Sequence, residues 1–260
     1  MTRVTPKKAL GQHFLVDPNV LGVIDRLAGL DEGDVVLEIG PGLGVLTTFL
    51  ADRVRHVHAV ELDRSLAEPL RTTLGERGNV TLVFGDALSL DVAALEPTAH
   101  KLVANLPYNV ATPLVVETLV GVPVLESWCV MVQREVAERF FAEPGTKAYG
   151  AVSVIVRLHA RRTGFHPVSR TVFRPQPNVD SALVAFERIA PPADVGRLRR
   201  VVFGAFAHRR KTLANSLALA GVAPRDVAVE ALAAIGRPPA IRAEALEPEE
   251  FVHLAEALPA

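Results

Sequence analysis

Continuous apolar runs alternate with amphipathic stretches along the first two thirds of the chain. Short runs rich in valine and other β-branched residues predict buried strands over residues 35–39, 56–61, 80–84, 101–105, 127–132 and 152–158. Apolar positions at helical spacing predict helices after the turn at 17–19 and over 46–50, 65–74 and 113–120. Strands and helices in alternation are typical of a parallel sheet with helices on both faces.

The pattern changes near residue 190. Residues 190–193 read Ala-Pro-Pro-Ala, which is a linker signal, and beyond them the apolar positions predict short helices without strands. A chain of 260 residues has room for one large domain and a small annex. We therefore predict an α/β domain over 1–189 and a helical domain over 193–260.

Composition excludes several classes of protein. Apolar residues make up 49% of the chain, charged residues 22%, and the mean hydropathy is +0.26, which excludes disorder as the main state. One cysteine, Cys129, excludes a disulfide framework, and the histidines show no metal spacing, so no metal is expected. Without a membrane-length apolar run or a signal-peptide pattern, the sequence predicts a soluble, cytoplasmic protein.

Charge is nearly balanced in total but uneven along the chain. There are 28 Lys and Arg against 29 Asp and Glu, yet the segments 1–16, 151–174 and 197–211 contain basic residues and no acid. From residue 221 onward, seven acids stand against three arginines. Such a distribution suits a polyanion such as nucleic acid, with ordinary solvated surface as the alternative interpretation.

Glycine and polar residues follow four of the predicted strands. Right-handed crossovers bring the carboxyl ends of parallel strands to one sheet edge, where ligands bind. The segment Glu38-Ile-Gly-Pro-Gly-Leu-Gly44 covers the end of the first strand and the turn after it, and Glu61, Asp86 and Asn105 stand at the ends of the next three strands. A carboxylate at Glu61 can accept hydrogen bonds from ribose hydroxyls, and Asp86 from an adenine amino group. These residues indicate an adenosine-containing ligand, with a purely structural turn as the alternative.

The spacing of the glycines separates two candidate ligands. A dinucleotide-binding turn has the pattern G-x-G-x-x-G, which requires glycine at position 45. This chain has Val45 there and Gly44 one residue earlier. The sequence therefore favours S-adenosylmethionine over NAD.

The segment Asn105-Leu106-Pro107-Tyr108 has two interpretations. Asn and Pro are common in turns, so the segment can be structural. The chemical alternative starts from the adenine amino group, a poor nucleophile because its lone pair is delocalised into the ring. The Asn105 side-chain oxygen and a nearby backbone carbonyl can accept its two N–H bonds and aim the lone pair at a methyl donor. Tyr108 offers a ring face on which an unstacked base can lie.

Seven motifs follow one another in an order that points to a family. They are Lys8-Ala-Leu-Gly-Gln-His-Phe-Leu15, Glu38-Ile-Gly-Pro-Gly-Leu-Gly44, Glu61-Leu-Asp63, Gly85-Asp-Ala87, Asn105-Leu-Pro-Tyr-Asn-Val-Ala-Thr-Pro113, Phe173-Arg-Pro-Gln-Pro-Asn-Val-Asp-Ser181 and Phe206-Ala-His-Arg-Arg-Lys-Thr-Leu-Ala-Asn-Ser-Leu217. Each motif alone is unspecific, but the ordered set covers nearly the whole chain. The chain resembles the rRNA adenine N6,N6-dimethyltransferases of the small ribosomal subunit (the KsgA/RsmA family).

This resemblance implies a Rossmann-like class I methyltransferase fold, with a mostly parallel seven-stranded sheet and a small C-terminal α-helical domain. It implies S-adenosylmethionine as the methyl donor. The implied acceptors are two adjacent adenosines in the 3′-terminal hairpin of 16S rRNA, each dimethylated on N6 during small-subunit biogenesis. The expected partner is 16S rRNA in the small subunit or its precursor, bound by a monomer and away from any membrane.

The resemblance also implies which residues form the site. The donor-binding positions are Gln12, His13, Leu15, Gly40, Gly42, Glu61, Leu62, Asp86, Ala87 and Asn105. The catalytic positions are Asn105, Leu106, Pro107, Tyr108 and Phe173, the last as a second aromatic ring on the target base. The basic stretches give the RNA-binding candidates Arg157, Arg209, Arg210 and Lys211.

One residue departs from the family pattern. Many members carry Asn where this chain has His13, for which we expect a neutral imidazole or a ring turned away from the donor sulfur.

The nearest rival is the macrolide-resistance type, which methylates 23S rRNA on the same scaffold. A non-catalytic assembly factor, a DNA adenine methyltransferase with Asp-Pro-Pro-Tyr at this loop, and an NAD enzyme are further alternatives.

Overall fold

The computed structural model describes residues 6–7 and 11–259 of the chain. Arg3 and Lys8 of the predicted N-terminal basic stretch therefore lie outside the described residues. The chain forms two compact units. The first contains the described residues up to Ala137 together with Arg161–Arg188, and the second contains Glu138–Ala160 and the chain from Ile189 onward.

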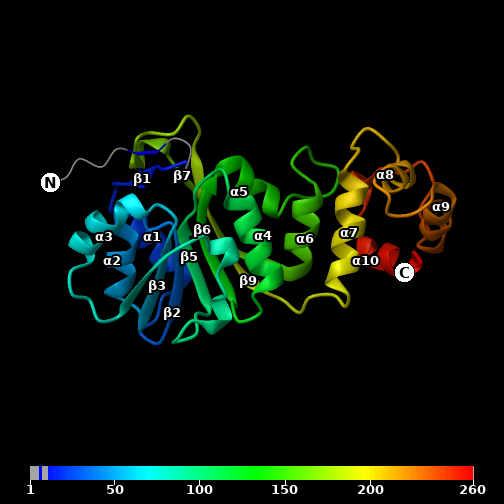
Figure 1. The fold of residues 1–260 in the computed structure, drawn as a ribbon. Coiled ribbons are helices and arrows are strands. Elements are labelled where there is room, and N and C mark those ends of the chain that lie inside the picture. The colour runs from blue at the N-terminus through cyan, green and yellow to red at the C-terminus, as the bar shows by residue number, and fades with distance from the viewer. Residues whose placement is uncertain (1–5, 8–10, 260) are drawn as a thin grey trace. The chain divides into compact units, whose positions relative to one another are not determined.

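A seven-stranded sheet lies at the centre of the first unit, in the order β4-β3-β2-β5-β6-β9-β7 (Figure 1). Its strands are β2 (Val35–Ile39), β3 (His56–Glu61), β4 (Val80–Phe84), β5 (Lys101–Asn105), β6 (Ser127–Gln133), β7 (Ala160–Val168) and β9 (Ser181–Arg188). The strands β2 to β6 run parallel, whereas β9 runs antiparallel to β6. The expected α/β fold with a mostly parallel seven-stranded sheet is confirmed.

Helices cover both faces of this sheet. The helices of the first unit are α1 (Asn19–Ala28), α2 (Val45–Ala51), α3 (Ala67–Leu74) and α4 (Ala111–Gly121), and α5 (Arg134–Phe140) begins in it. Neighbouring residues of β6 point to opposite faces, as strand geometry requires. Cys129 lies in one core with Ile24 of α1, whereas Trp128 donates a 3.1 Å hydrogen bond from Nε1 to Thr118 Oγ1 of α4.

A two-stranded sheet closes one side of the first unit. It pairs β1 (Phe14–Leu15) with β8 (Phe173–Arg174) in antiparallel register, with Leu15 opposite Phe173. Both of these residues are buried in the same core as α1 and α2. The sequence pattern predicted neither of these short strands, because two residues leave no period to detect, and it also missed the longer strands β7 and β9.

The predicted strand over 152–158 is wrong, because these residues belong to the helix α6 (Ala151–His159). An apolar run that is buried on nearly every side gives no period that separates a helix from a strand. Two hydrogen bonds of Ser153 stabilise the start of the helix. Ser153 Oγ accepts from the Gly150 amide over 3.2 Å and donates to the Arg139 carbonyl over 2.6 Å.

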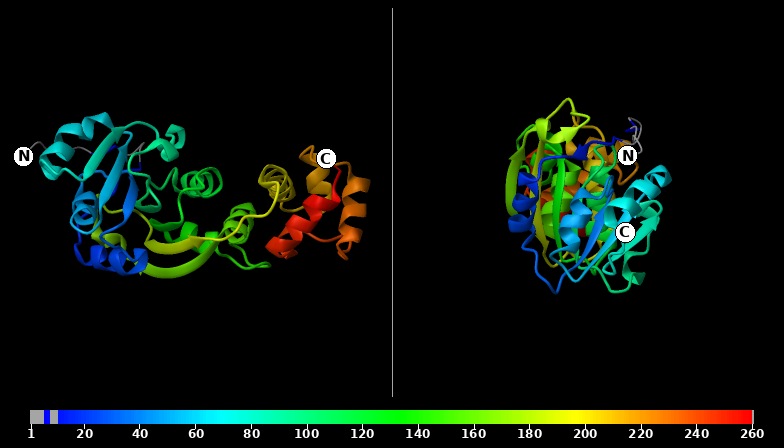
Figure 2. Two further views of the ribbon diagram at one scale, coloured as in Figure 1. Left: turned by 90° about the horizontal axis from the view of Figure 1, so that it is seen from below. Right: turned by 90° about the vertical axis from the view of Figure 1, so that its left-hand side faces the viewer.

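The second unit is helical. Besides α6 it contains α7 (Val195–Phe206), α8 (Leu213–Leu219), α9 (Arg225–Ala234) and α10 (Pro248–Ala257), and the yellow-to-red helices group together in Figure 2. Helix α6 packs against α7 and α10. The predicted division at 189 assigned 138–160 to the first domain, whereas these residues pack with the C-terminal helices. None of the helices among the described residues has the length and apolar character needed to cross a bilayer.

Candidate active site

A pocket opens at the carboxyl edge of the parallel strands. Its volume, counted with its open mouth, is about 870 Å³, within the range of small-molecule sites. Four segments form its walls: the N-terminal residues 11–15, the glycine turn after β2 with the start of α2, the end of β3, and the loop after β5. The strand ends meet here because β2, β3 and β5 run parallel and side by side.

The glycine turn after β2 brings backbone close to the N-terminal wall. Gly40, Gly42 and Gly44 all have positive φ, at 76°, 60° and 83°. A Cβ on Gly42 would lie 2.9 Å from a ring carbon of Phe14, closer than side-chain atoms approach. Gly42 is therefore required both by its backbone conformation and by the ring beside it.

Glu61 is held at the end of β3 by two backbone amides. Its Oε2 accepts from the Gly42 amide over 3.2 Å, and its Oε1 accepts from the Asp63 amide over 2.8 Å. Burial raises the pKa of Glu61, although both hydrogen bonds oppose that effect. The carboxylate thus has a fixed position on the pocket wall, with lone pairs that can accept further donors.

Gln12 supports the same wall through Asp63. The Gln12 amide nitrogen donates to Asp63 Oδ2 over 3.0 Å, and the Lys7 ammonium lies 2.6 Å from Oδ1. Burial alone raises the pKa of Asp63, but hydrogen bonds from Lys7, Ser65 and Gln12 hold it well below its ordinary value. Gln12 therefore ties the N-terminal segment to the residues after β3.

Glu38 is a pocket residue that sequence reasoning did not assign to the site. It is 1% exposed, and burial, with the nearby Glu61 charge, raises its pKa to about 8. Among the described residues, none hydrogen-bonds to its Oε2. A buried carboxylate oxygen without a partner suits a cationic ligand, which S-adenosylmethionine is. The signal in the sequence was a carboxylate inside an apolar strand, immediately before the glycine turn.

The loop after β5 presents Asn105 to the pocket. Asn105 Nδ2 donates to the His13 carbonyl oxygen over 3.1 Å, and no described residue donates to its Oδ1. The Leu106 amide donates to the Met131 carbonyl, and the Val110 amide to the Pro107 carbonyl, each over 3.1 Å. These bonds fix the loop backbone and direct the Asn105 side chain, with its oxygen left as the acceptor.

His13 and Tyr108 lie next to each other on the pocket wall. Their ring centres are 5.3 Å apart. His13 Nδ1 lies 2.7 Å from the Pro175 carbonyl oxygen, which can only accept, so Nδ1 carries the proton in this contact. The Tyr108 hydroxyl lies 2.5 Å from Ser181 Oγ.

The structure brings most of the predicted site residues together, but not all of them. Those that line the pocket are Gln12, His13, Leu15, Gly40, Gly42, Glu61, Leu62, Asn105, Leu106, Pro107 and Tyr108. Asp86 and Ala87 follow β4 and are not among the lining residues, and Asp86 Oδ1 accepts from the Leu88 amide over 3.0 Å. Phe173 is 1% exposed within the core, so this arrangement does not present its ring to a ligand.

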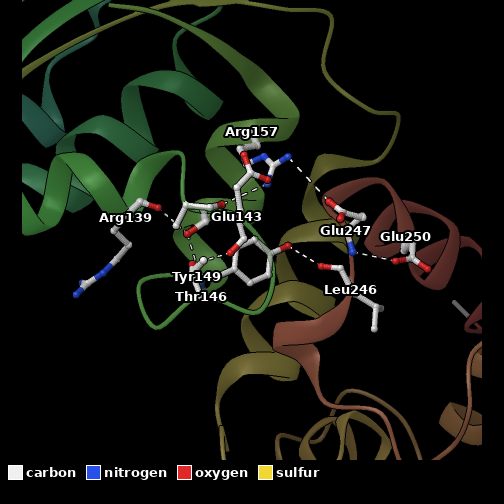
Figure 3. Close-up of polar contacts among 11 residues, drawn as sticks. Arg139, Glu143, Thr146, Tyr149, Arg157, Leu246, Glu247 and Glu250 are labelled. Carbon is white, nitrogen blue, oxygen red and sulfur yellow. Dashed lines mark hydrogen bonds and ion pairs between the residues drawn. The ribbon is translucent and has the colours of Figure 1, made fainter. Parts of the chain in front are cut away.

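The four predicted RNA-binding residues lie in the second unit and fall into two pairs. Arg157 contacts Glu143 over 2.8 Å and Glu247 over 4.0 Å (Figure 3). Arg209 donates to the Tyr149 carbonyl over 3.1 Å. Arg210 and Lys211, by contrast, are exposed, and no described residue contacts their side-chain charges.

The same contacts show what Arg157 does in the second unit. Figure 3 shows its guanidinium between the loop that carries Glu143 and the start of α10. Next to it, the buried Tyr149 donates from its hydroxyl to the Leu246 carbonyl over 2.8 Å. Arg157 thus links segments that lie far apart in the sequence. Among the described residues, no group of His, Cys, Asp and Glu side chains is arranged to hold a metal ion.

The fold and this pocket define an α/β methyltransferase of the class I type. Comparison with family models matches residues 3–255 to ribosomal RNA adenine dimethylase. Two curated relatives are both described as ribosomal RNA small subunit methyltransferase A. One, from Rubrobacter xylanophilus, is 50% identical and covers 96% of this chain and 94% of its own; the other, from Lactiplantibacillus plantarum, is 44% identical and covers 97% and 90%. The chain belongs to the ribosomal RNA adenine dimethylase family.

Two solved structures share the fold. A dimethyladenosine transferase from Plasmodium falciparum matches with a TM-score of 0.76 at 23% identity, over 93% of this chain and 96% of its own. The 23S rRNA methyltransferase ErmE matches with a TM-score of 0.68 at 30% identity, over 94% and 99%. The fold is therefore shared with a dimethyladenosine transferase and with a 23S rRNA methyltransferase.

Proposed function

We propose that this protein transfers methyl groups from S-adenosylmethionine to N6 of two adjacent adenosines in the 3′-terminal hairpin of 16S rRNA, and dimethylates both during small-subunit biogenesis. The observation that carries the proposal is the Asn105 side chain, fixed at the pocket by its bond to His13 with its oxygen free to accept. The family and the relatives named above supply the reaction class.

The residues around the glycine turn would hold the methyl donor. Glu61, fixed by the Gly42 and Asp63 amides, would accept from the ribose hydroxyls. Glu38, whose raised pKa keeps it protonated near neutral pH in the free protein, would lie beside the donor, and a nearby cation would favour its ionised form. When bound, S-adenosylmethionine supplies an electrophilic methyl group on a sulfonium sulfur. The close packing of Gly42 against Phe14 leaves no room for a larger side chain at position 42 of this wall.

The loop after β5 would prepare the acceptor nitrogen. Asn105 Oδ1 accepts one N–H of the adenine amino group, and a backbone carbonyl of the loop accepts the other, which draws the lone pair out of conjugation. No strong base is needed, because the amine loses its proton after it has been methylated. The Tyr108 ring holds the base by stacking, which is worth about 1–3 kcal/mol.

The second unit would bind the folded RNA. Arg210 and Lys211 are the contacts we propose, since their charges are exposed, whereas Arg157 is engaged within the unit. Phosphate contacts give an affinity that falls with salt. Folded RNA is read largely through its shape, so the helical unit need not read sequence.

The test compares rRNA from cells with and without this protein. We expect mass spectrometry to find two adjacent dimethyladenosines in 16S rRNA only when the protein is present, and primer extension to stop at that site. Purified protein with labelled donor should modify small-subunit particles and leave 23S rRNA unmodified. Modification of 23S rRNA instead would favour the macrolide-resistance activity, and the absence of any transfer would favour a binding role.

A further inference from the structure

A buried hydroxyl outside the pocket touches the proposed catalytic loop. Ser181 is the first residue of β9, is fully buried, and pairs with Gln133 of β6. Its Oγ lies 2.5 Å from the hydroxyl oxygen of Tyr108, and either hydroxyl can donate. Tyr108 lines the pocket, whereas Ser181 does not.

We propose that Ser181 is a positioning residue, which holds the Tyr108 ring in the orientation that receives the target adenine. The inference rests on the proposed function, since it assigns Ser181 to the acceptor side of that reaction. Ser181 touches neither the donor nor the base. It acts only through the tyrosine hydroxyl.

Tyr108 is fixed at both ends. At its backbone end, the loop is held by the amide of Leu106 on Met131 and the amide of Val110 on Pro107. At its hydroxyl end, Ser181 is the single partner among the described residues. A ring held at both ends has one orientation, so its face is preorganised before a base arrives.

Burial makes it unfavourable to break this hydrogen bond. The Ser181 side chain is fully buried, and burial raises the pKa of the half-buried Tyr108 hydroxyl, so both groups are neutral. If the ring swung away, the Ser181 hydroxyl would remain buried without a partner, which is unfavourable. The hydrogen bond therefore opposes rotation of the tyrosine about its χ1 bond.

The segment that leads to Ser181 is itself anchored. It starts at β8, which pairs with β1, and its Pro175 carbonyl accepts from His13 Nδ1 over 2.7 Å. It ends at β9, where Ser181 begins the register with β6. The hydroxyl of Ser181 thus stands on backbone that is fixed on both sides, as a positioning group requires.

The first experiment is a double-mutant cycle on small-subunit particles. Ser181→Ala and Tyr108→Phe each remove one hydroxyl of the pair, and we expect each to lower kcat about 5- to 20-fold with the KM for S-adenosylmethionine unchanged. The double variant should lose no more than either single variant. Ser181→Thr keeps the hydroxyl and suits a strand, so it should stay within about twofold of the wild type.

Three kinetic outcomes would overturn the inference: a wild-type kcat in Ser181→Ala, losses that multiply in the double variant, or a Ser181→Thr variant as impaired as Ser181→Ala. The free energy of unfolding is measured for each protein, so that a loss of fold is recognised. If Ser181→Ala does not fold, Tyr108→Phe breaks the same bond from the pocket side, and a wild-type kcat in that variant would overturn the inference.

The second experiment needs neither RNA nor methyl transfer. The chain has two tyrosines, so protein labelled with ¹³C at the tyrosine Cζ gives two resonances, and Tyr108→Phe assigns them. We expect Ser181→Ala to shift the Tyr108 resonance and Ser181→Thr to restore it, while Tyr149, bonded to Leu246, stays unchanged as an internal control. An unshifted Tyr108 resonance in Ser181→Ala would contradict the inference. If the wild type does not methylate rRNA, the proposed function is wrong, but the resonance shift still tests whether Ser181 holds the Tyr108 hydroxyl.

Discussion

The side-chain amide of Asn105 donates to the backbone carbonyl of His13 over 3.1 Å, which joins the loop after β5 to the N-terminal wall of the pocket. Ninety-two residues separate the two positions in the chain. The bond uses the nitrogen of the amide and leaves the oxygen as the acceptor. The wall that would bind the donor therefore also orients the group that would bind the acceptor.

Replacement of Asn105 by Ala should abolish most of the turnover and leave the fold intact. The variant removes the only side-chain acceptor proposed for the adenine amino group, and loss of one such group typically lowers kcat about 100- to 1,000-fold. Single-turnover methylation of small-subunit particles measures the effect. Asn178→Ala, at an exposed position whose backbone carbonyl accepts from Arg170, is the matched control and should keep wild-type turnover.

His13→Asn should retain activity. The bond to Asn105 uses the main-chain carbonyl of His13, which the substitution preserves, and the ring contacts with Pro175 and Tyr108 are lost. We expect kcat within about threefold of the wild type, since a neutral hydrogen bond contributes only about 1 kcal/mol. Steady-state kinetics measures it. A loss as large as that of Asn105→Ala would show that the imidazole itself takes part in the reaction.

The stability of the protein should fall as the pH rises from about 4.5 to about 8. Burial raises the pKa of Glu38 from 4.5 to about 8, so the folded state binds a proton that the unfolded state releases in this interval. The stabilisation is fully present below pH 4.5 and is lost as the pH rises through 8. The slope is at most about 1.4 kcal/mol per pH unit for one group.

Glu38→Gln should flatten that dependence, because glutamine stays neutral at every pH. Urea unfolding at a series of pH values measures the slope, and Glu230→Gln on the exposed side of α9 serves as the control. Glu61, whose pKa burial also raises, contributes in the same direction, so some slope should remain. An identical slope in wild type and Glu38→Gln would mean that Glu38 is ionised in the folded protein.

Charge reversal at Arg210 and Lys211 should weaken RNA binding and reduce its salt dependence. Their charges are exposed, and each lost phosphate contact lowers the slope of log affinity against log salt by about 1. Filter binding to 16S rRNA at several salt concentrations measures both quantities. An unchanged slope would remove these residues from the RNA interface.

Arg157→Gln provides the contrasting case in the same unit. In the wild type the Arg157 guanidinium contacts Glu143 and donates to the Ala142 carbonyl. Loss of these contacts should lower the free energy of unfolding by about 1–2 kcal/mol. The salt slope of RNA binding should stay as in the wild type. Thermal unfolding and the binding assay together separate a structural arginine from an RNA contact.

Much of the first unit could be predicted from the sequence. The strands β2, β3, β5 and β6 are buried on both faces, so their apolar runs are continuous and mark the parallel sheet directly, whereas the edge strand β4 is only partly buried. The residues at the ends of β2, β3 and β5 were found because parallel strands bring those ends to one edge. The helix α6 was misread because a short apolar run rich in valine is ambiguous between a strand and a helix.

The sequence by itself determined the alternation of strands and helices, the glycine turn and the chemistry of the strand ends, because these follow from local patterns. Only the tertiary structure decided that Asn105 bonds to His13, that Ser181 holds Tyr108, that Phe173 is buried in the core, and that Arg157 is paired within the second unit. These contacts join residues between 14 and 92 positions apart. Such pairs depend on how the elements pack, and no local pattern records that packing.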